Sequence, residues 1–193
     1  HKHLGVEKET ELTGRGVAYC ATCDGMFYKD KVVAVVGGGN SAVADALYLS
    51  RLCKKVYLIH RRDTLRATKI YHKPLMEVEN VEFRWNSTIS RVLADEKVSG
   101  VLIRDIVTGD ESVVEAQGVF VSIGRKPASS LVAGQAELDE SGYIVADEST
   151  RASIPGVFAV GDVRTKALRQ IITAAADGAM AVHSAEEYLS EKG

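Results

Sequence analysis

Residues 31–42 read Lys-Val-Val-Ala-Val-Val-Gly-Gly-Gly-Asn-Ser-Ala, an apolar run that ends in a glycine-rich turn. The run predicts a buried strand, and apolar residues at helical spacing after the turn predict a helix. Between a strand and a helix, the spacing G-x-G-x-x-A is typical of a loop that binds the pyrophosphate of a dinucleotide. Gly37 would permit the tight turn, Gly39 would let backbone N–H groups approach the anion, and Ala42 would let helix and strand pack closely. A glycine turn without a ligand is the alternative. The residues implicated are Gly37, Gly39, Asn40, Ser41 and Ala42.

A second apolar run at residues 56–59 predicts the next strand, which ends in His-Arg-Arg-Asp at 60–63. This position, about 20 residues after a glycine loop, meets the adenosine ribose in dinucleotide-binding folds. A carboxylate there would bind a free 2′-hydroxyl, whereas planar guanidinium groups suit a 2′-phosphate. The arginines therefore favour NADPH over NADH, although an aspartate follows them and a solvated strand end is the alternative. The residues implicated are His60, Arg61, Arg62 and Arg66.

The rest of the chain continues this alternation of strands and helices. Further strands are predicted at 81–85, 101–106 and 119–123, so strand, helix and strand indicate a parallel βαβ core. After residue 127 the pattern predicts a hairpin at Ser141-Gly142, a strand at 157–160 and a long helix. That helix would have one apolar face, made of Leu168, Ile171, Ile172, Ala175, Ala179 and Val182.

The composition is that of a globular protein. The 193 residues are 46% apolar and 26% charged, with a formal net charge of −2. At roughly 150 residues per domain, this length allows one large domain, or one domain and part of a second. The balanced charge predicts no nucleic-acid partner, and no apolar run reaches the roughly 18 residues of a membrane span. Because the three cysteines are too sparse for a disulfide scaffold, we expect a cytoplasmic protein.

Two of the cysteines, Cys20 and Cys23, stand at C-x-x-C spacing just before the first strand. Such a pair can close a disulfide, and one of its thiols can be activated by its surroundings. A structural zinc ion would need four ligands, and the chain offers only Cys53 and scattered histidines, so we expect no metal site. Asp24 is placed to exchange the proton that dithiol and disulfide interconversion requires, or it is a solvated turn residue. Cys53 continues the apolar face of the helix after the glycine loop and is predicted to be buried.

Five motifs follow one another along the chain. They are Cys-Ala-Thr-Cys-Asp-Gly at 20–25, the glycine loop at 37–42, His-Arg-Arg-Asp at 60–63, Gly-Val-Phe-Val-Ser-Ile-Gly-Arg-Lys-Pro at 118–127 and Gly-Val-Phe-Ala-Val-Gly-Asp-Val at 156–163. In this order and spacing the chain resembles low-molecular-weight thioredoxin reductases, and the resemblance covers essentially its whole length.

The resemblance implies a relay of electrons from NADPH through FAD to the cysteine pair, and from the dithiol to a disulfide of thioredoxin. Carried over by position, Cys20 would attack the thioredoxin disulfide, Cys23 would face the flavin, and Asp24 would act as the acid. A homodimer is expected on the same ground.

The resemblance also assigns cofactor contacts in the second half of the chain. Asp162 would hold the ribitol of FAD, and the helix that follows would begin near the flavin ring, where a helix N-terminus stabilises negative charge. The further cofactor-binding residues implied are Ile123, Gly124, Gly161, Asp162, Arg169, Gln170 and Ile171.

Taken together, we expect an α/β protein with a Rossmann-like three-layer NADPH-binding domain plus the C-terminal part of a similar FAD-binding domain. Residues 1–16 would be a linker and remnant of the FAD domain, 17–127 the NADPH-binding domain with the redox pair, and 128–193 the C-terminal segment of the FAD-binding domain. The family has a second G-x-G-x-x-G near its N-terminus for the FAD pyrophosphate, and no such motif precedes Val17. We therefore expect FAD binding in the intact protein only, and exposed apolar helix faces after Pro127 in this chain.

Three other functions fit part of the pattern. The flavoprotein component of alkyl hydroperoxide reductase shares the cysteine pair and the glycine loop but favours NADH, which the two arginines disfavour. A module that binds NADPH without turnover differs from the enzyme in its flavin content. A relative that takes electrons from ferredoxin or another flavin source would not need the glycine loop and the arginine pair.

Overall fold

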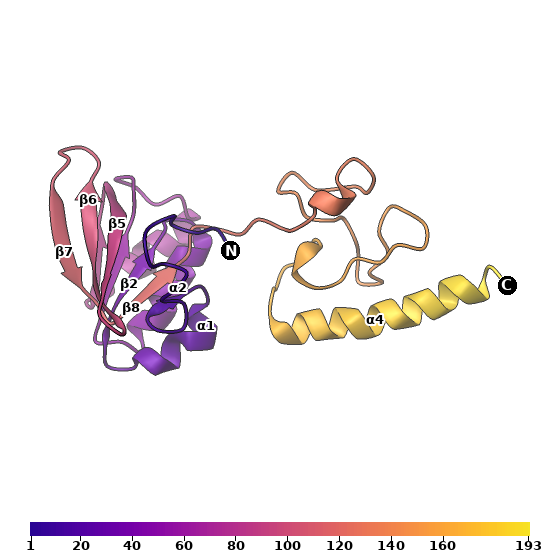
Figure 1. Cartoon of the computed structure of the whole chain (residues 1–193), viewed down its shortest axis with the longest axis horizontal. Coiled ribbons are helices and arrows are strands. Elements are labelled where there is room, and N and C mark those ends of the chain that lie inside the picture. Colours follow the sequence, from indigo (N-terminus) through magenta and orange to yellow (C-terminus); the bar gives the residue numbers. More distant parts are fainter. The chain divides into compact units, whose positions relative to one another are not determined.

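The computed structural model describes residues 1–193 as two compact units, His1–Arg125 and Lys126–Gly193 (Figure 1). In the first unit the strands are β1 (Val17–Ala18), β2 (Val32–Val36), β3 (Lys55–Ile59), β4 (Val81–Arg84), β5 (Ser87–Ala94), β6 (Val98–Asp105), β7 (Glu111–Glu115) and β8 (Gly118–Val121). Its helices are α1 (Ala21–Asp24), α2 (Asn40–Ser50) and α3 (His72–Met76), and α4 (Ile171–Ser190) lies in the second unit. None of these helices is long and apolar enough to cross a membrane.

A five-stranded parallel sheet forms the centre of the first unit. Its strand order is β1-β8-β2-β3-β4, and each neighbouring pair runs parallel. The predicted strands at 32–36, 56–59, 81–85 and 119–123 are confirmed as members of this sheet: the first has the same bounds, and the others have ends shifted by one or two residues. The α/β fold class is therefore confirmed, and the carboxyl ends of all five strands lie at one edge of the sheet.

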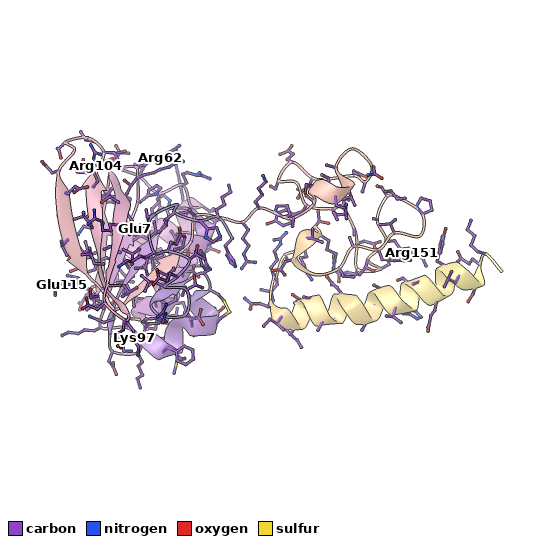
Figure 2. The ribbon with its side chains drawn as sticks, viewed as in Figure 1. Glu7, Arg62, Lys97, Arg104, Glu115 and Arg151 are labelled. Atoms are coloured by element: carbon purple, nitrogen blue, oxygen red, sulfur yellow. A yellow bond between two sulfur atoms is a disulfide. The ribbon has the colours of Figure 1, made fainter.

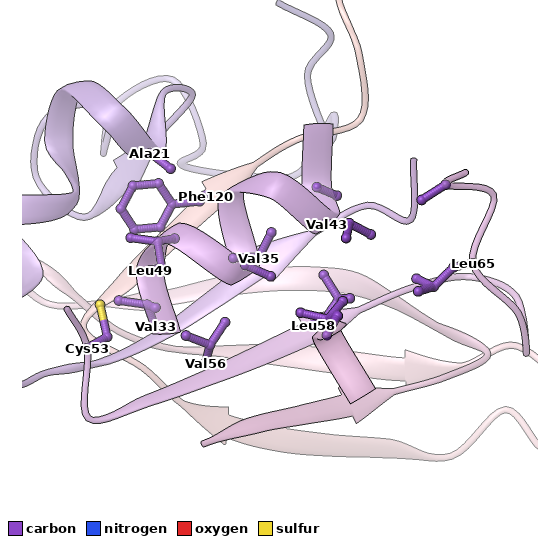
Figure 3. Packing of buried hydrophobic residues seen from close by; sticks show 14 of the residues in the cluster. Ala21, Val33, Val35, Val43, Leu49, Cys53, Val56, Leu58, Leu65 and Phe120 are labelled. Atoms are coloured by element: carbon purple, nitrogen blue, oxygen red, sulfur yellow. The ribbon is translucent and has the colours of Figure 1, made fainter. Parts of the chain in front are cut away.

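The two faces of the sheet are covered by different layers. Alternate residues of β2, Val33 and Val35, point to the face covered by α2, where they pack with Leu49 and Phe120 (Figure 3). Cys53 is confirmed as buried in this cluster, although α2 ends three residues before it. Because side chains alternate along a strand, the intervening residues of β2 face the opposite layer.

The opposite layer is an antiparallel sheet in the order β5-β6-β7, visible beside the parallel sheet in Figure 1. Ile89, Val101 and Val114 from its three strands are buried against the parallel sheet. The predicted strand at 101–106 is the second half of β6, but β5 and β7 were missed. Two register shifts interrupt the alternation of β5, and Val113 of the edge strand β7 is 59% exposed, so neither strand has a clean period of two.

Residues 1–16, which we expected to be a linker, belong to the first unit. They contain turns and one isolated bridge between Thr13 and Val17, and the side chain of Leu12 is buried under the antiparallel layer's cluster. The Lys2 N–H donates to the carbonyl of Gly124 at 3.0 Å, which joins the chain's beginning to the end of β8.

The second unit has little regular structure apart from α4. The tight turn at Ser141-Gly142 is confirmed by the isolated antiparallel bridge between Leu138 and Ile144. The strand predicted at 157–160 is wrong, because Phe158 forms only one isolated bridge, with Arg151. A single bridge cannot extend into a ladder, so the apolar run remains irregular.

The long helix is confirmed as α4, but Leu168 lies outside it because Gln170 is the N-cap. The expected apolar face is largely exposed within the second unit: Ile171 is 89%, Ile172 74% and Val182 62% exposed. The buried side of α4 instead contains polar residues, including Asp177 and Ser184.

Candidate functional site

The candidate site lies along the carboxyl edge of the parallel sheet. The cysteine pair follows β1, Ile123 and Gly124 follow β8, the glycine loop follows β2, and the basic segment follows β3. These segments are far apart in the sequence, but β1, β8, β2 and β3 are consecutive neighbours in the sheet. Ligands of open parallel sheets bind outside this edge, where the strand order reverses.

The cysteines form a disulfide at the surface of the first unit, seen as the yellow bond in Figure 2. Cys20 is the N-cap of α1, and its sulfur accepts a hydrogen bond from the Cys23 N–H at 3.2 Å. Cys20 is half-buried and Cys23 is exposed. Asp24 is half-buried at the end of α1, directly beside Cys23. The disulfide is therefore accessible to a reactant through Cys23, and an acidic residue directly follows it in the chain.

The first and third glycines of the loop, Gly37 and Gly39, differ in backbone conformation and in the space around them. Gly37 has φ +143°, and a Cβ there would lie 2.4 Å from the Ser122 carbonyl oxygen. Gly39, the N-cap of α2, has open space where its Cβ would be. The loop thus packs tightly against the protein at Gly37, whereas it has free space at Gly39. Gly39 is the position predicted to approach the pyrophosphate. Ala42, in the first turn of α2, is fully buried, while Ser41 is exposed at the N-terminus of the same helix.

The second glycine of the loop has a contact that the motif did not predict. A Cβ on Gly38 would lie 2.3 Å from the ring of His60, so only glycine fits there. His60 is buried, and its Nε2 has no hydrogen-bond partner. Burial lowers the pKa of His60, and the neighbouring arginines lower it further. This imidazole is therefore a neutral group that packs under the loop.

Three exposed arginines surround this position: Arg61, Arg62 and Arg66. The segment that contains them is tied to the glycine loop, because the Arg66 N–H donates to the Gly38 carbonyl at 2.7 Å. Asn40 adds a second tie, since its Oδ1 accepts from the Thr68 N–H at 2.8 Å. The backbone of the basic segment is thus held next to the loop, while the three guanidinium groups are exposed and can meet an anion. No sequence motif pointed to Thr68.

A network next to the cysteine pair was also missed. The buried Glu9 carboxylate accepts hydrogen bonds from the Leu4 and Gly5 N–H groups, at 2.8 and 2.9 Å, and from the Tyr19 hydroxyl at 2.9 Å. Burial opposes ionisation of Glu9, but these bonds hold its pKa below the usual value. Burial and the Glu9 carboxylate raise the pKa of Tyr19 to about 12. Tyr19 directly precedes Cys20, so this network anchors the backbone before the disulfide.

The remaining predicted residues lie in the second unit. Gly161 and Asp162 form a 3-10 turn, in which Gly161 has φ +73°. Gln170 caps α4, and its N–H donates a hydrogen bond to the Thr173 hydroxyl oxygen at 3.1 Å. The Arg169 guanidinium stacks on the Tyr143 ring, with its central carbon 3.9 Å from the ring centre, and Ile171 is exposed at the helix start. These residues surround the N-terminus of a 20-residue helix.

Asp177 holds this turn in place. Its carboxylate accepts from the Gly161 N–H at 2.8 Å, from Arg164 at 2.8 and 2.7 Å, and from the Lys166 ammonium at 2.7 Å. Arg164 is 1% exposed and Asp177 is 6% exposed. The Arg164 guanidinium beside Asp177 holds the pKa of that carboxyl far below its usual range. Helical spacing alone gave no sign of this ion cluster, because Asp177 falls between apolar positions.

The sequence is similar to known proteins over nearly its whole length. The family described as pyridine nucleotide-disulphide oxidoreductase matches residues 1–178. Thioredoxin reductase from Listeria monocytogenes is 46% identical over 192 residues, which are 99% of this chain and 60% of the relative. Thioredoxin reductase from Mycolicibacterium smegmatis is 48% identical over 99% of this chain and 62% of the relative.

The fold of the chain is also similar to that of solved structures. The crystal structure of thioredoxin reductase from Streptococcus pyogenes superimposes with a TM-score of 0.93 at 44% identity, over 99% of this chain and 63% of that chain. The present chain therefore spans about 60% of the length of the relatives it matches.

Proposed function

Because this chain belongs to the pyridine nucleotide-disulphide oxidoreductase family, we propose that it supplies the NADPH-binding part and the redox disulfide of a thioredoxin-disulfide reductase. One observation carries the proposal: a glycine loop, three solvated arginines and an accessible disulfide lie along the same edge of one parallel sheet. The thioredoxin reductases among its relatives support the choice of partner.

NADPH would bind across the glycine loop. The pyrophosphate would approach Gly39 and the N-terminus of α2, where the helix dipole and free N–H groups favour an anion. The 2′-phosphate would meet Arg61, Arg62 and Arg66, which hold no carboxylate partner. Ile123 and Gly124, after β8, would contact the other half of the dinucleotide.

In the reaction, NADPH, one proton and the Cys20–Cys23 disulfide give NADP⁺ and the dithiol, so two electrons reduce one S–S bond. The Cys20 thiolate then attacks a thioredoxin disulfide and forms a mixed disulfide, releasing one thioredoxin thiol. The Cys23 thiolate attacks Cys20 in turn, which releases the second thiol and restores the Cys20–Cys23 bond. Asp24 would donate a proton to a departing thiolate.

FAD, when bound, would carry the electron pair between NADPH and the disulfide. Gly161, with its positive φ, and the Asp162 carboxyl could face the ribitol, while Arg169, Gln170 and Ile171 surround the N-terminus of α4. The chain contains no second G-x-G-x-x-G, so its own residues would hold only this part of FAD. On the resemblance we also expect the intact protein to be a cytoplasmic homodimer.

Competition between NADPH and NADH for the chain tests the nucleotide choice. We expect NADPH to bind at least tenfold more tightly, because a charge-assisted bond to phosphate contributes about 1.5–3 kcal/mol. The double variant R61A/R62A should remove this preference and leave NADH affinity unchanged. R91A, which removes an exposed arginine from β5, is the matched control. Equal affinity of the wild type for both nucleotides would contradict the proposal.

The visible absorption spectrum of the intact protein, taken before and after NADPH is added without oxygen, tests the flavin step. A flavin band that bleaches supports the reductase. An intact protein that shows no flavin band after incubation with FAD would overturn the flavin step and leave a nucleotide-binding module.

A further inference from the structure

Asp45 on α2 forms a side-chain contact that the proposed chemistry does not use. Its carboxylate accepts a hydrogen bond from the hydroxyl of Ser122, 77 residues later in the chain and directly after β8. Burial raises the pKa of Asp45, while the Ser122 hydroxyl and the positive charge of Arg125 lower it. This hydrogen bond of a half-buried carboxylate joins α2 to the end of β8.

Ser122 is also the residue against which the glycine turn closes. Its N–H donates to the Val36 carbonyl at 2.8 Å, and its carbonyl oxygen lies where a Cβ on Gly37 would be. Ser122 therefore lies where the end of β8 meets the turn between β2 and α2. Asp45 contacts it from the helix side.

The strand order shows which half of a dinucleotide lies over this link. The order reverses between β8 and β2, so a bound dinucleotide would lie across that point, with its pyrophosphate at the glycine loop. The arginines that suit the adenosine 2′-phosphate follow β3, on the far side of β2. The nicotinamide half must then extend over the end of β8, above Ser122.

We propose that Asp45, through Ser122, is a positioning residue for the nicotinamide half of the dinucleotide. This inference rests on the proposed function, because it requires that a dinucleotide binds at the loop. Asp45 holds the end of β8 in the position that the nicotinamide ribose contacts. The adenosine half depends instead on the arginines and on the hydrogen bonds that Gly38 and Asn40 form with the basic segment.

The test compares two ligands on the full chain by titration calorimetry: NADP⁺, and adenosine 2′,5′-bisphosphate, which lacks the nicotinamide half. We expect D45A to weaken NADP⁺ binding about tenfold, within the range of one hydrogen bond to a charged group. Bisphosphate binding should stay within about twofold of the wild type, and it also reports that the loop is folded. S122A should behave like D45A, and the double variant should be no worse than either single one. If D45A does not fold, the smaller change S122A provides the test.

Asparagine at position 45 separates geometry from charge. D45N keeps an oxygen that accepts from Ser122, so it should restore most of the NADP⁺ affinity that D45A loses. Equal weakening of both ligands in D45A and S122A would overturn the inference, because a general structural role predicts that result. Tighter binding in both D45A and D45N would also overturn it, because only the lost negative charge would then matter. A wild type that binds neither ligand refutes the proposed function itself, whereas unchanged variants of a wild type that binds both refute this inference alone.

Discussion

At the scale of single residues, the glycine loop provides a matched pair of positions. Gly37 has a positive φ and no space for a Cβ, whereas Gly39 has φ −91° and open space. We expect G37A to destabilise the first unit by about 2–5 kcal/mol, through backbone strain and overlap with Ser122. G39A should change stability by no more than about 1 kcal/mol. Thermal unfolding of both variants measures the difference.

G39A, which should barely change stability, should strongly weaken nucleotide binding. The added methyl group of G39A occupies the space that a pyrophosphate would need, so we expect at least a tenfold loss of NADPH affinity in a folded protein. Undiminished NADPH binding by G39A would mean that the anion does not approach the loop at this position.

Tyr19 predicts a pH dependence at the alkaline end. Its pKa is raised to about 12 by burial and by the Glu9 carboxylate, so the folded state favours the neutral phenol. This contribution to stability is complete below pH 10 and is lost as the pH rises toward 12. Y19F removes the bond to Glu9 and should destabilise the first unit by about 1–3 kcal/mol at neutral pH. The stability difference between wild type and Y19F, measured by denaturant unfolding from pH 8 to 12, should shrink above pH 10; a constant difference would contradict the assignment.

At the scale of elements, strands were predicted where burial leaves a pattern in the sequence. β2 is buried on both faces and reads as an uninterrupted apolar run, so its position followed directly from the sequence. β5 was missed because its bulges break the alternation, and the run at 157–160 was overpredicted because no partner strand lies beside it. Hydrophobic pattern reports burial, whereas strand formation also needs a neighbour with a compatible register.

The ion cluster at the start of α4 is the element in which one charge matters most. Removing Asp177 leaves the buried Arg164 with only the exposed Glu148 carboxylate, 3.6 Å away, and breaking a buried ion pair costs about 3–5 kcal/mol. We therefore expect D177A to unfold the second unit at a lower temperature, as followed by circular dichroism of α4. E187A removes the exposed ion pair with Arg151 and should change the stability by less than about 1 kcal/mol.

The pH dependence of this cluster has a definite sign. Because the pKa of Asp177 is lowered in the folded state, its contribution is complete above the unfolded pKa near 4 and falls only as the solution becomes strongly acidic. The stability gap between wild type and D177A should therefore be constant from pH 5 to 8 and narrow below pH 4. A gap that narrows already near pH 6 would point to a different titrating group.

At the scale of the whole molecule, the sequence revealed the motifs but not their geometric relations. Cysteine pair, glycine loop and arginines each had a local pattern, and sheet topology explains why they share an edge. The Asp45–Ser122 link and the Asp177 cluster join residues many positions apart, and their side chains are common polar types with no spacing rule. Such contacts depend on tertiary structure, so a single sequence contains no signal for them.

The two units also differ in how much apolar surface they bury. The first unit has a buried cluster on each face of its sheet, whereas the buried cluster of the second unit contains only Ile144, Ala146 and Ala159. The second unit additionally exposes Ile171, Ile172 and Val182 along α4. Little apolar burial gives little free energy against local opening.

We therefore expect residues 128–193 to exchange their amide protons faster than residues 32–59 and 118–121 when the chain is studied alone by mass spectrometry. Within the second unit, the Gly161 N–H should be the slowest to exchange, because Asp177 accepts its hydrogen bond in a buried site. I171S/I172S should leave the exchange of the first unit unchanged and reduce binding of a hydrophobic dye, since it removes exposed apolar surface. Strong, uniform protection across residues 128–193 would show that the ion cluster and the small apolar cluster suffice to hold this unit together without further burial of α4.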